Sequence, residues 1–312
     1  MKRLAAIDIG TNTILLLVAD IGEDGKIFPL RDMERTTRLG WGLVETGRLH
    51  PESMEKSLQV IKHYLSVCRR MEVERVLMVG TNALRTATNS DDFVNSVHRC
   101  SKLRVQIISG EEEATLSYLA VEGEMGQGSA ILVLDIGGGS VELIVGKSGQ
   151  ISDFYSLDIG ALGLTERFLK SDPVVEEEFR QMADHISQKL CSVAIKPPKQ
   201  VVGLGGTITT ISAVQRGKNR FDPSLLHGSL LSHEDVNQQV LLYKRMSQNQ
   251  RCCIPGLPRE RADVILAGAA ILLGVMNILG FRRLIVSCRG LRYGLIHASA
   301  SGQCIEKGGK SC

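Results

Sequence analysis

The sequence contains two pairs of matching segments, and this repetition constrains the fold more than any other feature. Residues 4–20 (LAAIDIGTNTILLLVAD) and 132–146 (LVLDIGGGSVELIVG) each consist of an apolar strand, Asp-Ile-Gly, a small polar turn and a second apolar strand. Residues 75–88 and 200–214 each lead from a β-rich strand through Gly-Thr into the start of a helix. Each hairpin motif is thus followed by a strand–turn–helix motif.

The spacing between the motifs is nearly the same in both halves. Asp8 and Thr81 are 73 residues apart, and Asp135 and Thr207 are 72 residues apart. The ordinary punctuation of an α/β protein could recur in this way by chance. The shared order and interval instead favour an internal duplication, with two similar domains that face each other across a cleft.

Other segments alternate between helical and strand patterns. Residues 51–71 have the apolar spacing of a helix, with Leu58, Ile61 and Leu65 on one face. The remaining predicted elements are a strand at 102–109 with a helix after it, a helix at 173–194, and a strand, a turn and a last helix within 282–299. This alternation predicts an α/β protein, in which helices cover the faces of sheets.

The composition excludes some classes of partner. The 312-residue chain is long enough for two domains. Its net charge is +3 and its aromatic content is 4%, so neither nucleic acid nor a membrane surface is an expected partner. The longest uncharged run, 264–281, is rich in Gly and Ala and is expected to be a buried helix rather than a membrane span.

Cysteine usage and the N-terminus indicate a cytoplasmic location. None of the eight cysteines forms a C-x-x-C pair, and the seven histidines do not cluster with them. We therefore expect reduced thiols and no zinc site. The N-terminal apolar run contains Asp8 and does not have the pattern of a signal peptide.

The glycine-rich turns are candidate phosphate sites. A turn without Cβ atoms lets backbone N–H groups converge on one anion, and the Gly-Thr turns would aim helix N-termini at the same cleft. One such turn is weak evidence, because glycine turns are also common in hairpins, but the repeated order favours phosphate binding. The candidate phosphate-binding residues from these turns are Thr11, Asn12, Thr13, Gly137, Gly138, Gly139, Ser140, Gly206 and Thr207.

Two carboxylates flank the second hairpin turn and are candidate metal ligands. If the turn is 137–140, Asp135 lies directly opposite Glu142 in the strand pair. Like charges at opposed positions are destabilising, and Mg²⁺, or another divalent cation such as Mn²⁺, would offset the repulsion. The first hairpin lacks this pairing, because Asp8 faces Leu15, so the cation should be held mainly by the second half. Asp8 is a third candidate ligand. The alternative is that Glu142 points to solvent.

The segment ISGEEEATLSYLAV (108–121) predicts a helix with acidic residues in its first turn. Ser109 and Glu112 fit a capping box. Glu113 shares a face with apolar residues and is a candidate general base, but Glu112 is also close to an apolar face, and spacing alone does not choose between them. Arg85, one helical turn after the first Gly-Thr turn, could hold phosphate through its planar guanidinium or form a surface salt bridge.

With these residues in view, the sequence resembles the exopolyphosphatase/guanosine pentaphosphate phosphatase (Ppx/GppA) family over nearly its whole length. This family is part of the acetate and sugar kinase, chaperone and actin superfamily. The motifs that carry the resemblance are AAIDIGTNTILLLVAD, VGTNALRTATNSDDF, ISGEEEATLSYLAV, LVLDIGGGSVELIVG, GLGGTITTISAV, HGSLLS, IPGLPRERADVILAGAAIL and GLRYGLI.

The resemblance implies an α/β fold of two actin-like (ribonuclease H-like) domains with the active site in the cleft between them. It places the first domain at 1–124 and the second at 125–295, and a C-terminal helix at about 296–312 would complete the first domain. The resemblance also implies a homodimer.

The resemblance further implies hydrolysis of the terminal phosphate of inorganic polyphosphate, or of guanosine pentaphosphate (pppGpp) to ppGpp. The family's catalytic glutamate falls on Glu113 and its phosphate-contacting arginine on Arg85. Its second phosphate loop falls on 135–140, with Glu142. In the implied mechanism, Arg85 and Mg²⁺ neutralise the phosphate charge while Glu113 deprotonates the attacking water.

The sequence departs from the family pattern at three points. Family members often have Arg where Thr115 stands, and Ser-Asp before the last Gly-Leu-Arg, where this chain has Ser287, Cys288 and Arg289. Longer members carry a C-terminal helical HD-type extension that this sequence lacks, so less surface would grip a long polymer.

Two rival functions stay open. They are a kinase of the same superfamily and a non-catalytic regulator that binds guanosine polyphosphates.

Overall fold

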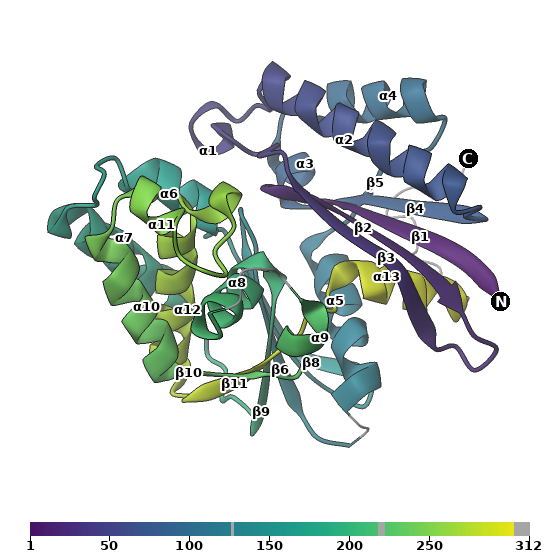
Figure 1. Ribbon diagram of the computed structural model, residues 1–312. Helices are drawn as coiled ribbons and strands as arrows, with labels where there is room; N and C mark the ends of the chain where they lie inside the picture. Colours follow the sequence, from purple (N-terminus) through teal and green to yellow (C-terminus); the bar gives the residue numbers. More distant parts are fainter. Residues whose placement is uncertain (126–127, 218–221, 303–312) are drawn as a thin grey trace.

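The strands of the protein form two separate sheets (Figure 1). The computed structural model describes residues 1–125, 128–217 and 222–302, and the description below is of these residues. The first sheet has the order β3-β2-β1-β4-β5 and consists of β1 (Lys2–Ile9), β2 (Thr13–Ile21), β3 (Ile27–Thr36), β4 (Arg75–Gly80) and β5 (Gln106–Ile107). The second has the order β10-β11-β9-β6-β7-β8 and consists of β6 (Ile131–Ile136), β7 (Val141–Lys147), β8 (Gln150–Leu157), β9 (Gln200–Leu204), β10 (Leu230–Ser232) and β11 (Arg283–Val286).

The two sheets repeat one topology. In the first, β1, β2 and β3 form an antiparallel meander and β4 lies parallel to β1. In the second, β6, β7 and β8 form the same meander and β9 lies parallel to β6. This strand order is that of the actin-like (ribonuclease H-like) fold, so the prediction of an α/β protein with two actin-like units is confirmed.

Helices separate and cover the sheets. They are α1 (Leu43–Thr46), α2 (Pro51–Arg70), α3 (Asn82–Thr86), α4 (Ser90–Ser101), α5 (Gly110–Met125), α6 (Ala161–Phe168), α7 (Glu176–Leu190), α8 (Gly205–Gln215), α9 (Pro223–Leu226), α10 (His233–Arg245), α11 (Gln248–Arg251), the 3-10 helix η1 (Arg259–Arg261), α12 (Ile265–Leu279) and α13 (Leu291–Ala300). We call the first sheet with α1 to α4 and α13 the first lobe, and the second sheet with α6 to α12 the second lobe.

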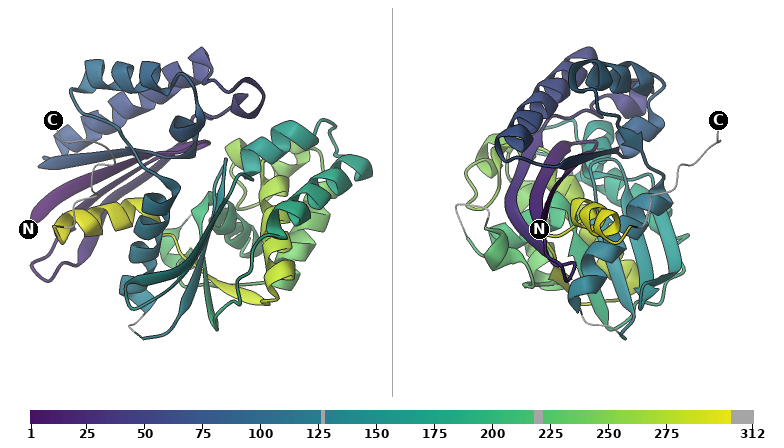
Figure 2. Two further views of the ribbon diagram at one scale, coloured as in Figure 1. Left: turned by 180° about the vertical axis from the view of Figure 1, so that it is seen from behind. Right: turned by 90° about the vertical axis from the view of Figure 1, so that its right-hand side faces the viewer.

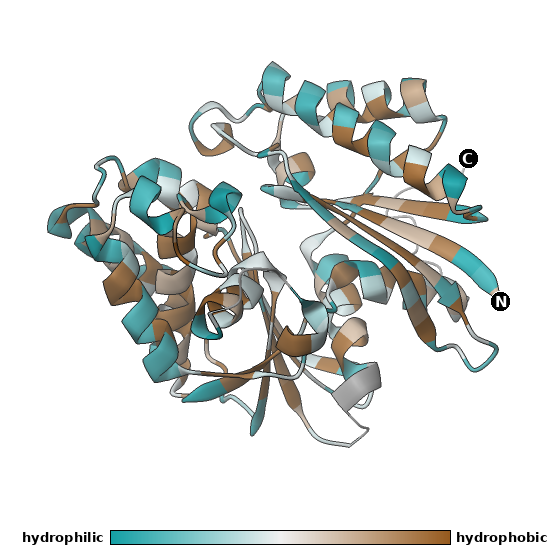
Figure 3. Ribbon diagram, in the orientation of Figure 1, coloured by the Kyte–Doolittle hydropathy of each residue, from teal (hydrophilic) through white to brown (hydrophobic). Residues whose placement is uncertain are grey.

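The helices and sheets stack in layers, and α5 and α13 lie side by side between the two sheets (Figure 2). Helices α2 and α4 bury their apolar sides on the outer face of the first sheet, and α13 covers its inner face. Helix α5 packs on the inner face of the second sheet through Ala114, Tyr118 and Val121. Helices α7, α10 and α12 cover the outer face of that sheet. Burial of these apolar faces is the main source of stability, and Figure 3 shows hydrophobic residues concentrated in the central strands.

The contact between α5 and α13 is close because Gly294 of α13 has no side chain. A Cβ atom at Gly294 would overlap the backbone carbonyl of Leu116 in α5. A larger residue at this position would push the two helices apart. The pair therefore fixes the distance between the lobes at the closed end of the cleft.

The predicted helices match the structure well, but two predicted elements are shorter than expected. The helix predicted at 51–71 is α2, and the apolar run 264–281 contains α12, which is buried along most of its length. The strand predicted at 102–109 pairs only at Gln106–Ile107, and Lys102 instead ends α4 in a left-handed conformation with φ of 63°. The helix predicted at 173–194 begins only at Glu176, because Val175 is extended.

Two further predictions concern the chain ends and the membrane. No helix in the described ranges is long and apolar enough to cross a membrane. The expected C-terminal helix at 296–312 corresponds to α13 up to Ala300, while residues 303–312 lie outside the described residues. Residues 126–127, just after the expected domain boundary between 124 and 125, also lie outside the described residues.

Candidate active site

A cavity of about 500 Å³ lies between the lobes, at the carboxyl ends of the central parallel strands. The turn after β1, the start of α3 after β4, the turn after β6 and the start of α8 after β9 all line it. Open α/β sheets place their ligand sites at such strand ends. The predicted residues that line the cavity are Asp8, Thr11, Asn12, Thr13, Glu113, Asp135, Gly137, Gly138, Gly139, Ser140, Glu142, Gly206 and Thr207.

The two hairpin turns contact each other across the cleft. A Cβ atom at Gly138 would lie 2.9 Å from Cβ of Asn12 and 3.2 Å from its backbone nitrogen, so only glycine allows this approach. The second turn is held in place by α6, because the Leu162 N–H donates a 2.9 Å hydrogen bond to the Gly138 carbonyl. The cavity opens directly beside this contact, where both turns can present N–H groups to one anion.

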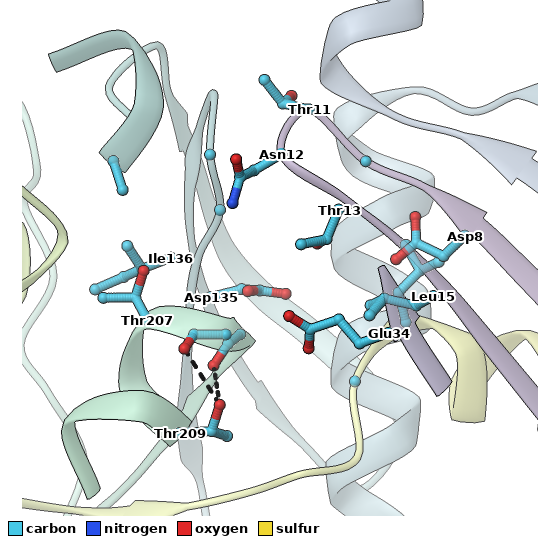
Figure 4. A pocket seen from close by; sticks show the side chains of 18 of the residues that line it. Asp8, Thr11, Asn12, Thr13, Leu15, Glu34, Asp135, Ile136, Thr207 and Thr209 are labelled. Atoms are coloured by element: carbon cyan, nitrogen blue, oxygen red, sulfur yellow. Dashed lines mark hydrogen bonds between the residues drawn. The ribbon is translucent and has the colours of Figure 1, made fainter. Parts of the chain in front are cut away.

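Helix α8 begins at the wall of the cavity. Its first residues, Gly205, Gly206 and Thr207, line the cavity, and most of the helix behind them is buried. The positive end of the helix dipole and the free N–H groups of this first turn favour a negative ligand. In Figure 4, Thr207 lies on the side of the cavity opposite Asp8 and Leu15.

Arg85 and Glu113 form a hydrogen-bonded ion pair at the cavity. Arg85 Nη1 donates a 2.7 Å hydrogen bond to Glu113 Oε2 and a 3.0 Å hydrogen bond to the carbonyl of Ile108. Glu113 is largely buried, and burial raises its pKa, while the positive charge of Arg85 lowers it. Arg85 is the one predicted site residue that does not itself line the cavity, and it reaches the site through Glu113.

The neighbouring Glu112 has a structural role. Its N–H donates a 3.1 Å hydrogen bond to Ser109 Oγ, and its Oε2 accepts a 2.6 Å hydrogen bond from the Ser109 N–H. This is the predicted capping box, and it is confirmed. Because the box fixes Glu112 outside the cleft, Glu113 is the acid of this segment that faces the cavity.

Asp135 and Glu142 are directly opposed in the β6–β7 hairpin, and Asp8 is opposed to Leu15 in the β1–β2 hairpin, as the sequence predicted. Glu142 does not point to solvent, since it is only 3% exposed. Ser156 Oγ donates a 3.2 Å hydrogen bond to its Oε1. Figure 4 shows the carboxyl groups of Asp8 and Asp135 pointing toward each other from the two lobes.

The electrostatics of these carboxylates are unfavourable without a counter-ion. Burial and the charge of Glu113 raise the pKa of Asp8 and of Asp135 to about 7, and the charge of Asp135 also raises that of Asp8. Burial and the charges of Glu113 and Asp135 raise the pKa of Glu142 as well. Asp8 Oδ1 is buried and has no hydrogen-bond partner among the described residues. These groups are therefore short of positive charge.

The donor set is suited to a divalent cation that shares its ligands with a phosphate. In the described part of the chain, no three His, Cys, Asp or Glu side chains are grouped closely enough to enclose a metal ion alone. Mg²⁺, however, commonly binds through one or two carboxylates, with waters and phosphate oxygens completing its shell. Asp135, Glu142 and the unpartnered oxygen of Asp8 fit this mode of binding.

Sequence reasoning missed the arginines that complete the cavity. The Arg261 guanidinium lies directly over Gly206 and forms an ion pair with Glu34 of β3, 227 residues away. Arg292 of α13 is paired with Asp32 of β3 at 3.0 Å. Arg261 lies within the motif IPGLPRERADVILAGAAIL, but no local spacing in that motif indicates that it reaches the cleft.

Comparison with known proteins gives consistent relatives. The sequence profile of the Ppx/GppA phosphatase family matches residues 17–301. Exopolyphosphatase 2 of Mycobacterium tuberculosis is 34% identical over 284 residues, which cover 87% of this chain and 89% of that protein. A crystal structure of the Aquifex aeolicus Ppx/GppA family member is 36% identical with a TM-score of 0.82, covering 98% of this chain and 99% of that one. An exopolyphosphatase from Cytophaga hutchinsonii is 26% identical with a TM-score of 0.88, covering 96% and 98%.

Proposed function

The chain belongs to the Ppx/GppA phosphatase family, and on this premise we propose that it is an exopolyphosphatase that hydrolyses the terminal phosphate of inorganic polyphosphate. The observation that carries this proposal is the Arg85–Glu113 pair, because it puts a buried carboxylate into a cavity that two glycine turns and a helix N-terminus also line. A phosphate site with a positioned acid is what phosphoanhydride hydrolysis requires.

The terminal phosphate binds where the turns and α8 converge. Backbone N–H groups of 138–140 and of the first turn of α8, with the side chains of Thr11 and Thr13, surround the anion, while the Gly137 N–H is bonded to the Ser140 carbonyl. Arg261, which lies over Gly206, adds positive charge on the same side. Asp135 and Glu142, with Asp8, would hold a divalent cation such as Mg²⁺, which when bound supplies charge neutralisation at the phosphoryl oxygens.

Glu113 acts as the general base. Its Oε2 accepts the hydrogen bond from Arg85, which leaves Oε1 to accept a proton from water. The water oxygen attacks phosphorus in line with the bridging oxygen, the bridging P–O bond breaks, and the shortened chain leaves with the electron pair on its new terminal oxygen. A raised pKa improves Glu113 as a base near neutral pH.

Guanosine pentaphosphate is a second candidate substrate. The cavity of about 500 Å³ is larger than one phosphate needs, and apolar side chains such as Leu15, Leu162 and Val264 form part of its wall. A cavity of this size and mixed polarity suits a nucleoside. In pppGpp the 5′ γ-phosphate would occupy the terminal phosphate position, and the product would be ppGpp.

One assay tests these proposals together. Phosphate release is measured from tripolyphosphate, long-chain polyphosphate and pppGpp, with Mg²⁺ and with EDTA. Release from polyphosphate without any acceptor supports the exopolyphosphatase. A kinase would need ATP and an acceptor, and a regulator would bind guanosine polyphosphates without releasing phosphate. The implied homodimer stays a prediction, to be measured by light scattering.

A further inference from the structure

A second cavity, of about 380 Å³, lies on the outer side of the first lobe between β3 and α2. Its lining residues are Arg31, Met33, His63, Val67, Arg70 and Met71. Three of these residues are basic and none is acidic. A groove of this composition favours an anionic ligand.

This groove adjoins the cleft along β3. Met33 lines both cavities, and Arg35, two residues further along the strand, lines the cleft. Arg31, Met33 and Arg35 share one face of β3, since side chains alternate along a strand. At a rise of about 3.3 Å per residue, Arg31 and Arg35 are roughly 13 Å apart, which leaves room between them for several consecutive phosphates.

The acidic residues of β3 lie on its opposite face. Asp32 and Glu34 alternate with the basic residues and pair with Arg292 and Arg261, at the inner side of the sheet. This arrangement removes their negative charge from the groove.

The basic residues of the groove are available to a ligand. Arg31 and Arg70 are exposed and have no carboxylate partner among the residues described. Arg35 is also exposed and donates only to the backbone carbonyl of Glu34. An exposed guanidinium without a partner can bind phosphate oxygens bidentately.

We propose that the groove formed by Arg35, Met33, Arg31, His63 and Arg70 binds the part of a polyphosphate chain that extends out of the cleft. This assignment rests on the proposed exopolyphosphatase function, since it requires the chain end to lie in the cleft. A repeating polyanion matches a row of cations that runs away from the phosphate site. A tripolyphosphate bound in the cleft is expected to stop short of Arg31 and Arg70, whereas a long chain reaches them.

The test compares binding of long-chain polyphosphate and of tripolyphosphate at equilibrium. It uses the full-length chain with Glu113→Gln, so that the ligand is not consumed, with and without the double substitution Arg31→Ala and Arg70→Ala. Loss of two exposed cation–phosphate contacts should weaken binding of the long chain about tenfold and reduce its salt dependence. Binding of tripolyphosphate should change by less than about twofold. The matched control is Arg69→Ala, an exposed arginine on the same turn of α2 that does not line the groove.

The outcomes distinguish the proposal about the groove from the proposal about hydrolysis. The assignment is overturned if the double substitution leaves long-chain binding unchanged, if it weakens both ligands equally, or if Arg69→Ala has the same effect. Phosphate release by the wild-type chain is measured separately. A protein that binds long chains through Arg31 and Arg70 but releases no phosphate would reject the hydrolase and support the groove.

Discussion

Arg85 and Glu113, 28 residues apart in the sequence, meet in a 2.7 Å hydrogen bond between Nη1 and Oε2. Burial and the charge of Arg85 act in opposite directions on the protonation of Glu113. Burial raises the pKa of Glu113, and the guanidinium of Arg85 lowers it. Arg85 therefore helps to keep the carboxylate ionised in a site that otherwise favours its protonated form.

Replacing Glu113 with Gln should abolish most turnover and preserve binding. Gln has nearly the same shape and can still face Arg85, but it cannot accept a proton from water. Because a general base contributes about 10² to 10⁴ in rate, kcat for phosphate release should fall by at least about a hundredfold. Affinity for polyphosphate, measured by equilibrium binding, should stay within about threefold.

The matched control is Glu112→Gln. Gln at this position of a capping box still accepts the backbone hydrogen bond, so stability and kcat should stay close to those of the wild type. Equal loss of kcat in the two variants would remove the special role of Glu113.

Replacing Arg85 with Ala should shift the pH dependence of the reaction. Without the guanidinium, the pKa of Glu113 rises further, since the cause that lowers it is removed. The acidic limb of kcat/KM should move to higher pH, and activity at pH 7 should fall about a hundredfold. Arg85→Lys keeps the charge, so its limb should move less. An unchanged limb in the Ala variant, determined from a full pH–rate profile, contradicts this account.

Without divalent cations, the stability of the protein should decrease as pH rises from about 4 to about 7. Asp135 has a pKa of about 7 in the folded state, against an ordinary value of 3.8. Between these values the folded state binds the extra proton, so the free energy of unfolding falls with increasing pH and is level above pH 7. Each pKa unit corresponds to about 1.4 kcal/mol, so a shift of about three units makes Asp135 account for about 4 kcal/mol over this range.

Asp135→Asn should remove this contribution and make the protein more stable than the wild type at pH 8 in EDTA. Urea unfolding at pH 5, 6, 7 and 8 measures it, and Asp153→Asn, an exposed carboxylate on β8, serves as the control. Mg²⁺ should stabilise the wild type more at pH 8 than at pH 5. If the free energy of unfolding of the wild type and of Asp135→Asn depended on pH in the same way, a group other than Asp135 would be the cause of that dependence.

Gly294→Val should destabilise the protein by about 1–3 kcal/mol or more. The side chain would overlap the Leu116 carbonyl and force α13 away from α5, and overpacking of this kind costs about 1–3 kcal/mol or more. Thermal unfolding measures the change. Gly290→Ala is the control, since a Cβ atom there meets nothing within 4 Å, and a similar loss in both variants would argue against the helix contact.

The parts of the fold that local patterns determine could be predicted from the sequence. Both hairpins have apolar strands on either side of a short turn, so the register that opposes Asp135 to Glu142 follows from the turn length. The spacing of α2 identifies its buried face only in part, since Ile61 is buried, whereas Leu58 and Leu65 are half-buried beside it. The capping box of Ser109 and Glu112 is local as well.

Strand β3 was missed, and with it much of the cleft wall. Its residues are mostly exposed and highly charged, and it contains Pro29, so it lacks the apolar alternation of a half-buried strand. The pairing of Arg261 with Glu34 joins residues 227 positions apart, and no local pattern carries that information. The same holds for the partner of Arg85, because Glu113 lies 28 residues away in the sequence and on another helix.

The placement of the buried carboxylates has a mechanical consequence. Asp8 belongs to the first lobe, Asp135 and Glu142 to the second, and Glu113 to the helix between them. When ionised, these carboxylates repel one another across the gap, and this repulsion opposes closure of an empty cleft. A cation or ligand that neutralises the carboxylates would lower this repulsion. Its binding and the approach of the lobes would then be coupled through the same free energy.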